Sequence, residues 1–369
     1  MADTIKTAEN AVPSILDIRG LQKSFGPLTV LQDISLSVDR GNVISIIGPS
    51  GSGKSTLLRC AAFLERAEGG DILYDGQYAV KDGVYAPKAE LNRIRTRFGL
   101  VFQNFQLFPH YSVLKNISEA PILHGEDKEE VQERAMGLIR KMGLEGKEKA
   151  YPYQLSGGQQ QRAALARILV SEPRLLMLDE PFSALDAHLR DALKIELRDM
   201  LQRFGREVLM VTHSREEAYN MSRAIAVMDN GRLLTMKPTK ELFADPGSVQ
   251  AAVITGCKNI FPARKCGDFE VELPALGIRL KTARPVEDGL AAVGIRAHYF
   301  HPSAPHNRYP VRFVEEMEEP FETILQFRYA GQDPSSPPVW WRIPKDKRPA
   351  AFPQELGVAP ANVLLLYEI

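Results

Sequence analysis

The sequence predicts a mixed α/β core followed by a small all-β domain, and three observations carry this prediction. Up to about residue 245, short apolar runs typical of buried strands alternate with helical patterns. Beyond it, short strand-like runs are separated by proline and glycine, as in small barrels and sandwiches. Of the 25 prolines, 10 precede residue 245 and 15 follow it, although the second stretch is much shorter. We therefore expect a first domain over 14–245 and an all-β domain over 246–369.

The composition is that of an ordinary globular protein. The chain has 369 residues, of which 44% are hydrophobic and 25% charged, and this excludes collagen-like, disulfide-rich and wholly disordered classes. Its 46 basic residues balance its 46 acidic ones, so we expect no nucleic-acid partner. Three cysteines, an odd number, fit unpaired thiols in a reducing cytoplasm. The longest apolar runs have about five residues, whereas a membrane helix needs roughly 18 to 20, so we expect neither a signal peptide nor a spanning segment.

The first motif joins a buried strand to a helix through a glycine-rich loop. The strand pattern covers 42–47, the loop GPSGSGKST covers 48–56, and a helix-like segment covers 57–67. Glycines let the backbone curl so that successive N–H groups point at phosphate oxygens, and the helix N-terminus adds partial positive charge. Lys54 can neutralise the β- and γ-phosphates, and the Ser55 hydroxyl suits Mg²⁺. A functionless glycine-rich turn is the alternative, but the flanks favour a nucleotide site made of Gly48, Pro49, Ser50, Gly51, Ser52, Gly53, Lys54, Ser55 and Thr56.

Two carboxylates follow a second buried strand, over 174–178. Asp179 and Glu180 come directly after it, at the end of the strand where α/β sheets place ligands. Asp179 is expected to bind Mg²⁺ through water, and Glu180 to polarise the water that attacks the phosphate. The alternative is an acidic strand end held by its neighbours, which the phosphate loop makes the weaker interpretation.

Two helices are predicted from their periodic apolar positions. Asp127 can cap a helix that Gly143 ends, and a second pattern runs over 189–204 until Gly205. Both apolar stripes are typical of core faces.

A further motif, LSGGQQQR over 155–162, is similar to the signature of ATP-binding cassette (ABC) ATPases. It lies far enough beyond Lys54 to leave room for that family's helical insertion, here about 104–170. The other motifs of the family occur in order, and the resemblance covers about 14–245. It implies a P-loop NTPase of the ABC cassette type, with a RecA-like core and a helical subdomain, that binds ATP and Mg²⁺ and hydrolyses ATP.

The resemblance also implies roles for individual residues. Phe25 stands where the family stacks an aromatic on adenine, Gln103 lies in the Q-loop, and His213 ends the strand over 207–212 as the switch histidine. The segment Ser183–Asp186 matches the D-loop, which adds Asp186 to the nucleotide site. The implied catalytic residues are Glu180, His213 and Gln103, and the implied metal ligands are Ser55, Gln103 and Asp179.

The signature itself forms a second helix N-terminus suited to an anion, because Ser156, Gly157 and Gly158 precede an alanine-rich helix over 159–170. On its own, Ser156 could simply be a helix cap. In the family, residues of this motif contact the γ-phosphate held by the partner's loop. The resemblance thus implies a head-to-tail homodimer with two shared ATP sites, in which Ser156, Gly157, Gly158 and Gln159 contact nucleotide.

The tail and the cassette resemble different importers. Runs over 276–280 and 293–296 look like the small TOBE domain, an OB-like β fold, of importer ATPases, most of all the molybdate/sulfate-type branch. No clear Ser-Ala-Arg-Asn-type oxyanion pattern occurs there, so a structural or regulatory role is expected. In contrast, 99–110 and 151–156 resemble cassettes of polar-amino-acid importers.

The favoured hypothesis is the ATPase subunit of an ABC importer, cytoplasmic and peripheral on the inner face of the membrane. Its partners would be transmembrane permease subunits and, through them, a solute-binding protein; aromatics after Gln103 suggest a groove for a permease helix. The expected solute is an oxyanion such as molybdate or sulfate, with a polar amino acid as the alternative. A soluble ABC ATPase acting on DNA or ribosomes, or an anion-sensing regulator, stays open. The intact catalytic set argues against the regulator, and the absence of a coiled-coil or zinc-module pattern argues against the first.

Overall fold

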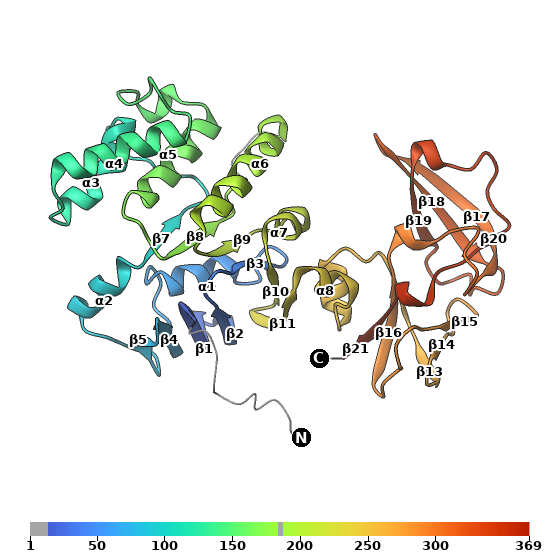
Figure 1. Ribbon diagram of the computed structural model, residues 1–369. Coiled ribbons are helices and arrows are strands. Elements are labelled where there is room, and N and C mark those ends of the chain that lie inside the picture. The colour runs from blue at the N-terminus through green and yellow to red at the C-terminus, as the bar shows by residue number, and fades with distance from the viewer. Residues whose placement is uncertain (1–13, 184–186, 369) are drawn as a thin grey trace. The chain divides into compact units, whose positions relative to one another are not determined.

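A computed structural model describes residues 14–183 and 187–368, apart from a few side chains in the helix that begins at Ala187 (Figure 1). The chain divides into two units, Met1–Leu233 and Leu234–Ile369, which we treat separately.

A six-stranded sheet in the order β11-β10-β3-β9-β8-β7 forms the centre of the first unit, and its edge strand β11 continues past Leu233 (Figure 1). Strands β10, β3, β9, β8 and β7 pair in parallel. Every residue of β8 and β9 is buried, as expected for parallel strands covered on both faces. The three buried strands predicted from the sequence are confirmed within one residue at each end. The bounds are β3 (Val43–Ile47), β7 (Phe98–Val101), β8 (Leu175–Asp179), β9 (Glu207–Val211), β10 (Ala224–Asp229) and β11 (Arg232–Pro238).

A second, five-stranded antiparallel sheet of order β2-β1-β4-β5-β6 was not anticipated from the sequence. Leu57 and Leu58 of α1 belong to one hydrophobic cluster with side chains of both sheets, so the core fixes this helix from two sides. The helix is shorter than predicted because Phe63 takes a positive φ of 57°, which ends the helical path. The bounds are β1 (Leu16–Phe25), β2 (Leu28–Val38), β4 (Gly69–Tyr74), β5 (Gln77–Lys81), β6 (Val84–Tyr85), α1 (Lys54–Ala61) and α2 (Lys88–Arg95).

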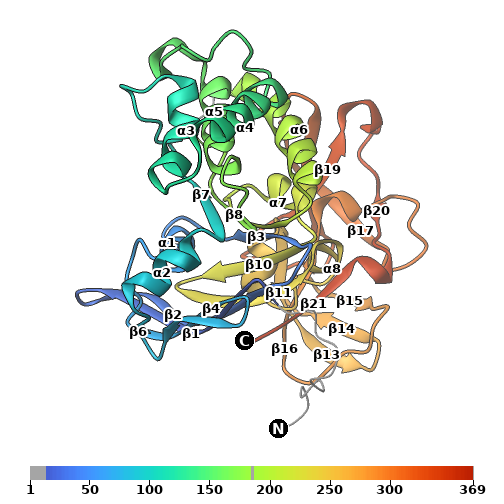
Figure 2. The same ribbon diagram turned by 60° about the vertical axis from the view of Figure 1, so that its left-hand side comes forward.

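Helices α3, α4 and α5 form a separate helical group with its own apolar cluster (Figure 2). Asp127 caps α4, since its carboxylate accepts from the backbone N–H groups of Glu129 and Glu130 at 2.9 and 3.0 Å. The helix predicted over 127–143 is therefore confirmed, as is the one predicted over 189–204. The bounds are α3 (Val113–Leu123), α4 (Lys128–Lys141), α5 (Gly157–Leu169), α6 (Ala187–Phe204) and α7 (Arg215–Met221).

The second unit is mainly β, with three small sheets of order β12-β16-β21, β13-β14-β15 and β19-β18-β17-β20. Val293, Val271 and Phe327, one from each sheet, belong to a single hydrophobic cluster, so the sheets share one core. The bounds are α8 (Thr239–Ala244), α9 (Val249–Ile254), β12 (Asn259–Pro262), β13 (Arg264–Gly267), β14 (Glu270–Leu273), β15 (Ile278–Lys281), β16 (Leu290–Ile295), β17 (Tyr309–Glu318), β18 (Glu322–Tyr329), β19 (Val339–Pro344), β20 (Glu355–Leu356) and β21 (Val363–Tyr367).

Candidate functional site

The candidate residues of the core gather at the carboxyl ends of four neighbouring parallel strands. The register pairs Ile46 with Val211, Val211 with Asp179, and Leu178 with Val101. Because the strands are parallel, the segments that follow them leave the sheet at one edge. These segments carry the glycine-rich loop after β3, His213 after β9, Glu180 after β8 and Gln103 after β7.

The glycines of the loop serve different purposes. Gly51 and Gly53 have φ values of 80° and 96°, which other residues rarely adopt. At position 48 glycine is required because there is no space for a side chain: a Cβ there would lie 2.1 Å from the backbone oxygen of Met228. Gly53 directly precedes α1, so the backbone N–H groups at the end of the loop are those of the helix N-terminus.

The close approach at Gly48 makes it sensitive to the smallest substitution. Gly48→Ala should lower the free energy of unfolding by about 2–4 kcal/mol and weaken ATP binding, because the backbone of β10 cannot yield to a methyl group. Urea unfolding and equilibrium nucleotide binding measure both effects. Gly137→Ala in α4 is the matched control, since a Cβ there meets nothing within 4 Å, and it should be neutral or slightly stabilising. A Gly48→Ala protein as stable as the parent would contradict this account.

Lys54 is held inside the loop by the loop itself. Its ammonium group donates to the backbone oxygens of Gly48 and Pro49 at 2.9 and 2.8 Å and lies 3.4 Å from Ser52 Oγ. The residue is 5% exposed. Burial lowers the pKa of Lys54, while the nearby Glu180 and Asp179 carboxylates act in the opposite direction. A fixed cation in a concave ring of backbone groups suits the β- and γ-phosphates of a nucleotide.

Ser55 and Asp179 could hold a divalent cation. Ser55 Oγ donates to Asp179 Oδ1 at 2.8 Å, which places two hard oxygen ligands side by side. Burial raises the pKa of Asp179, and the hydrogen bond from Ser55 acts against that rise. No group of three His, Cys, Asp or Glu side chains converges in the described part of the chain, so a protein-only cage is not formed there. One hydroxyl and one carboxylate, completed by phosphate oxygens and water, fit Mg²⁺ bound with a nucleotide.

Glu180 and His213 face each other beside this pair. His213 Nδ1 lies 3.3 Å from Glu180 Oε2. Glu180 has a φ of 47°, and the strained backbone is held on both sides. Its N–H donates to the carbonyl of Val211 at 2.9 Å, and its carbonyl accepts from Ser183 Oγ at 2.8 Å. A carboxylate so placed can accept a proton from water, and the imidazole can orient it.

Phe25 and Gln103 keep accessible side chains near the ends of their strands. Phe25, 45% exposed, ends β1, and Lys23 Nζ lies 4.6 Å from its ring centroid. An exposed ring suits a purine base. Sequence reasoning missed the contact of Lys23 with Phe25, because the register of β1 shifts between Lys23 and Ser24. Gln103 is exposed after β7, and Asp186 lies outside the described residues.

The signature residues are not part of this cluster. Ser156 caps α5 by accepting from the Gln159 N–H at 3.3 Å, and the Gln159 side chain accepts from the Ser156 N–H at 3.0 Å. Gly157 and Gly158 form the first turn of the helix. Both ribbon views place α5 well away from α1 (Figures 1 and 2). No hydrogen bond among the described residues joins the start of α5 to the glycine-rich loop. A nucleotide contact by Ser156 thus stays a prediction about a second chain.

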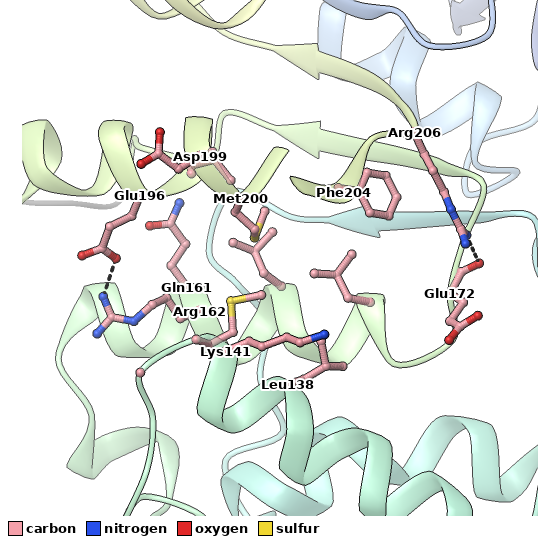
Figure 3. A pocket seen from close by; sticks show the side chains of 15 residues that line it. Leu138, Lys141, Gln161, Arg162, Glu172, Glu196, Asp199, Met200, Phe204 and Arg206 are labelled. Atoms are coloured by element: carbon pink, nitrogen blue, oxygen red, sulfur yellow. Dashed lines mark hydrogen bonds and ion pairs between the residues drawn. The ribbon is translucent and has the colours of Figure 1, made fainter. Parts of the chain in front are cut away.

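A separate pocket of about 740 Å³ lies between α4, α5 and α6 (Figure 3). The ion pair of Arg162 with Glu196, 2.7 Å long, bridges α5 and α6 beside it. Gln161 also lines the pocket and donates to the backbone oxygen of Pro181, the residue after Glu180, at 3.0 Å. None of the candidate nucleotide residues lines this pocket, so it is distinct from the site at the strand ends.

An aromatic patch follows Gln103. The rings of Phe108 and Tyr111 lie 5.3 Å apart, with Arg167 5.9 Å from Phe108 and Lys115 4.1 Å from Tyr111. Phe108 and Lys115 are exposed, whereas Tyr111 and Arg167 are half-buried, and a cluster of accessible rings and cations suits a protein partner. None of the described helices is long and apolar enough to cross a membrane.

Comparison with known proteins gives further evidence about the family of this chain. A family model described as ABC transporter matches residues 31–183. The chain is 44% identical over 235 residues to an L-cystine transport system ATP-binding protein of Escherichia coli, across 63% of this chain and 94% of that protein. It is 37% identical over 283 residues to an Fe(3+) ions import ATP-binding protein of Pasteurella multocida, across 76% and 78%. It is 36% identical over 331 residues to a sulfate/thiosulfate import ATP-binding protein of Halalkalibacterium halodurans, across 85% and 90%.

The fold has counterparts among solved structures. A dimeric ATP-binding cassette in a post-hydrolysis state, bound to ADP and phosphate, matches with a TM-score of 0.53 and 30% identity, over 61% of this chain and 98% of that one. The matched share corresponds in size to the first unit.

Proposed function

The chain belongs to the ABC transporter family of ATP-binding subunits, and from this premise we propose that it drives the import of a small oxyanion by hydrolysing ATP. ATP hydrolysis with Mg²⁺ is the activity of the family. The observation that carries the site proposal is the convergence of Lys54, Ser55, Asp179, Glu180 and His213 at one sheet edge.

Each residue has a proposed task in hydrolysis. The loop over 48–56 binds the phosphates, with Lys54 at the β- and γ-phosphates and Phe25 against the adenine ring. Ser55, Asp179 and Gln103 would hold Mg²⁺, which neutralises charge on the phosphate oxygens. Glu180 accepts a proton from the attacking water while His213 orients that water and the γ-phosphate, so proton transfer and positioning fall to different side chains.

We further propose a head-to-tail homodimer in which the signature of each chain completes the site of the other. Ser156, Gly157, Gly158 and Gln159 would supply a helix N-terminus, and the resemblance of 183–186 to the D-loop would add Asp186 to the same site. Their distance from the loop of their own chain supports this arrangement, as does the dimeric state of the solved cassette.

The membrane partner is proposed from the aromatic patch at Phe108 and Tyr111. A permease helix seated there would sense the Q-loop at Gln103 and so couple nucleotide state to transport. The chain would then act peripherally on the inner face of the cell membrane, with a solute-binding protein reached through the permease.

Three substrate classes compete, and the alignments differ in what they cover. The sulfate/thiosulfate relative aligns over 331 residues, more than the 233 residues of the first unit, so its similarity extends into the second unit. The cystine relative has higher identity, yet 94% of it is matched by 63% of this chain. The Fe(3+) relative also extends past the first unit, over 283 residues, but the sulfate/thiosulfate relative covers more of this chain, 85% against 76%. We therefore favour sulfate or molybdate over ferric iron or a polar amino acid, and treat 14–245 as the cassette, with its helical subdomain at about 104–170, and 246–369 as a TOBE-like domain.

The test is uptake by the complete transporter. The chain, purified with its permease and solute-binding protein, is placed in proteoliposomes, and ATP-driven uptake of labelled sulfate, molybdate, cystine and ferric iron is compared. We expect saturable uptake of one or both oxyanions and none with a Glu180→Gln subunit. Uptake of cystine or iron without either oxyanion would overturn the substrate proposal while leaving the importer proposal intact.

A further inference from the structure

Glu217 is a buried carboxylate that the proposed mechanism does not use. It lies in the first turn of α7, four residues after His213, and is 6% exposed. Burial raises the pKa of Glu217, and a hydrogen bond from Thr212 opposes that rise. Lys194 and Arg190 of α6 and His213 are the charged or titratable groups that also act on it. A buried acid with one specific partner calls for an explanation.

Its hydrogen bonds enclose the backbone on both sides of His213. Thr212 Oγ1 donates to Glu217 Oε2 in a short hydrogen bond and accepts from the Ser214 N–H at 3.0 Å. Ser214 Oγ in turn accepts from the Glu217 N–H at 3.3 Å. Thr212 is 1% exposed, and its own N–H donates to the carbonyl of Ile46 in β3 at 3.1 Å. The residues before and after His213 are thus fixed to Glu217 and to the sheet.

The His213 side chain has no comparable support of its own. Its side chain is 59% exposed, and its hydrogen-bond partner among the described residues is Glu180, 3.3 Å away. An imidazole on a free loop could not hold that distance, because rotation of one backbone dihedral would move the ring by several ångströms. The closed ring of hydrogen bonds from Thr212 through Ser214 to Glu217 removes that freedom.

We propose that Glu217 is a positioning residue, which holds the His213 imidazole against Glu180 through Thr212 and Ser214. This inference rests on the role proposed for His213 in ATP hydrolysis. Glu217 itself contacts neither nucleotide nor water in this scheme. What it requires of Glu217 is a buried hydrogen-bond acceptor, so a neutral amide should serve nearly as well as a carboxylate.

The first test is steady-state kinetics on the full-length chain. Glu217→Ala should lower kcat about tenfold or more while changing KM for ATP less than about twofold, since phosphate binding lies elsewhere. Glu217→Gln should recover most of that loss, because its amide oxygen can accept from Thr212. Glu216→Ala is the matched control on the same helix, since the Glu216 side chain is 68% exposed, and it should behave as the parent. A Glu217→Ala protein with parental kcat, or a Glu217→Gln protein no better than Glu217→Ala, would overturn the proposal.

The second test separates positioning from simple loss of stability. In a His213→Ala background, adding Glu217→Ala should reduce the residual single-turnover rate by less than about twofold, whereas independent effects would multiply. The imidazole ¹⁵N resonances of His213 should shift or broaden in Glu217→Ala and not in Glu216→Ala. Multiplying effects, or unchanged His213 resonances, would overturn the inference. Parental turnover of His213→Ala alone would instead refute the proposed role of His213, which is a different result.

Discussion

The Glu180→Gln variant is expected to bind MgATP as the parent does but to lose turnover by about 10²- to 10³-fold. The substitution keeps the size of the side chain and removes its ability to take a proton from water, because an amide is not a base near neutral pH. The supporting bonds to Val211 and Ser183 involve only the backbone of residue 180, so the loop should keep its shape. ATP should therefore persist in the site, and a nucleotide-bound dimer should accumulate.

Three measurements check this expectation: phosphate release, equilibrium nucleotide binding, and size-exclusion chromatography with light scattering in MgATP. Glu216→Gln is the control, since it makes the same chemical change on an exposed side chain of α7 and should leave all three unchanged. Near-parental phosphate release by Glu180→Gln would remove Glu180 from the role of base. Lost nucleotide binding would indicate instead that the negative charge of Glu180 contributes to binding. Glu180 lies close enough to Lys54 to act on the pKa of that residue, so this alternative can be measured.

The parallel core could be predicted because its signals are local. Strands such as β8, buried along their whole length, appear in the sequence as unbroken apolar runs ending in Asp179 and Glu180. The antiparallel sheet was missed since β1 and β2 are long and irregular: their register shifts between Ile18 and Leu21 and again near Lys23, so no clean alternation appears. The end of α1 at Ala61 was not predicted, because the left-handed conformation that follows it falls on Phe63. Glycine at such a position would have indicated a helix end, whereas phenylalanine does not.

In the candidate site, too, the residues with a local sequence signal could be predicted and the others could not. Motifs with fixed spacing placed Lys54, Ser55 and Asp179 correctly in one cluster, since parallel strands bring their carboxyl ends together whatever lies between them in sequence. The hydrogen bond from Thr212 to Glu217 could not be predicted from a motif. In the sequence, a buried glutamate in a short helix cannot be told from one on the surface. Gly48 was predicted for curvature, whereas the structure shows that close approach to Met228 excludes a side chain there.

The second large effect is expected at the signature. Ser156→Arg should lower steady-state ATPase activity about 100-fold or more, while the affinity of the monomer for ATP stays nearly unchanged. An arginine at this position removes the Ser156 cap of α5 and adds bulk and positive charge to the positive end of the helix, which repels Lys54 in the loop of a partner. The glycine-rich loop of the same chain is untouched, because no hydrogen bond among the described residues links it to the start of α5. Ser112→Arg is the matched control: Ser112 caps α3 in the same way, accepting from the Lys115 N–H at 3.3 Å, so its loss costs a cap without touching the signature.

Mixing Ser156→Arg chains with Lys54→Ala chains makes the test specific to a composite site. Each variant alone should be inactive, one through its signature and the other through its loop. In a mixed dimer, the intact loop of the first meets the intact signature of the second, while the opposite site carries both defects. Activity that returns on mixing therefore requires that one site draws on two chains, and its amount should rise with the fraction of mixed dimer. If both sites must be sound for turnover, the mixture stays inactive, but the homodimer still decides: a Ser156→Arg protein with parental ATPase activity would contradict the shared site, because a residue this large at the helix start would block any phosphate from reaching it.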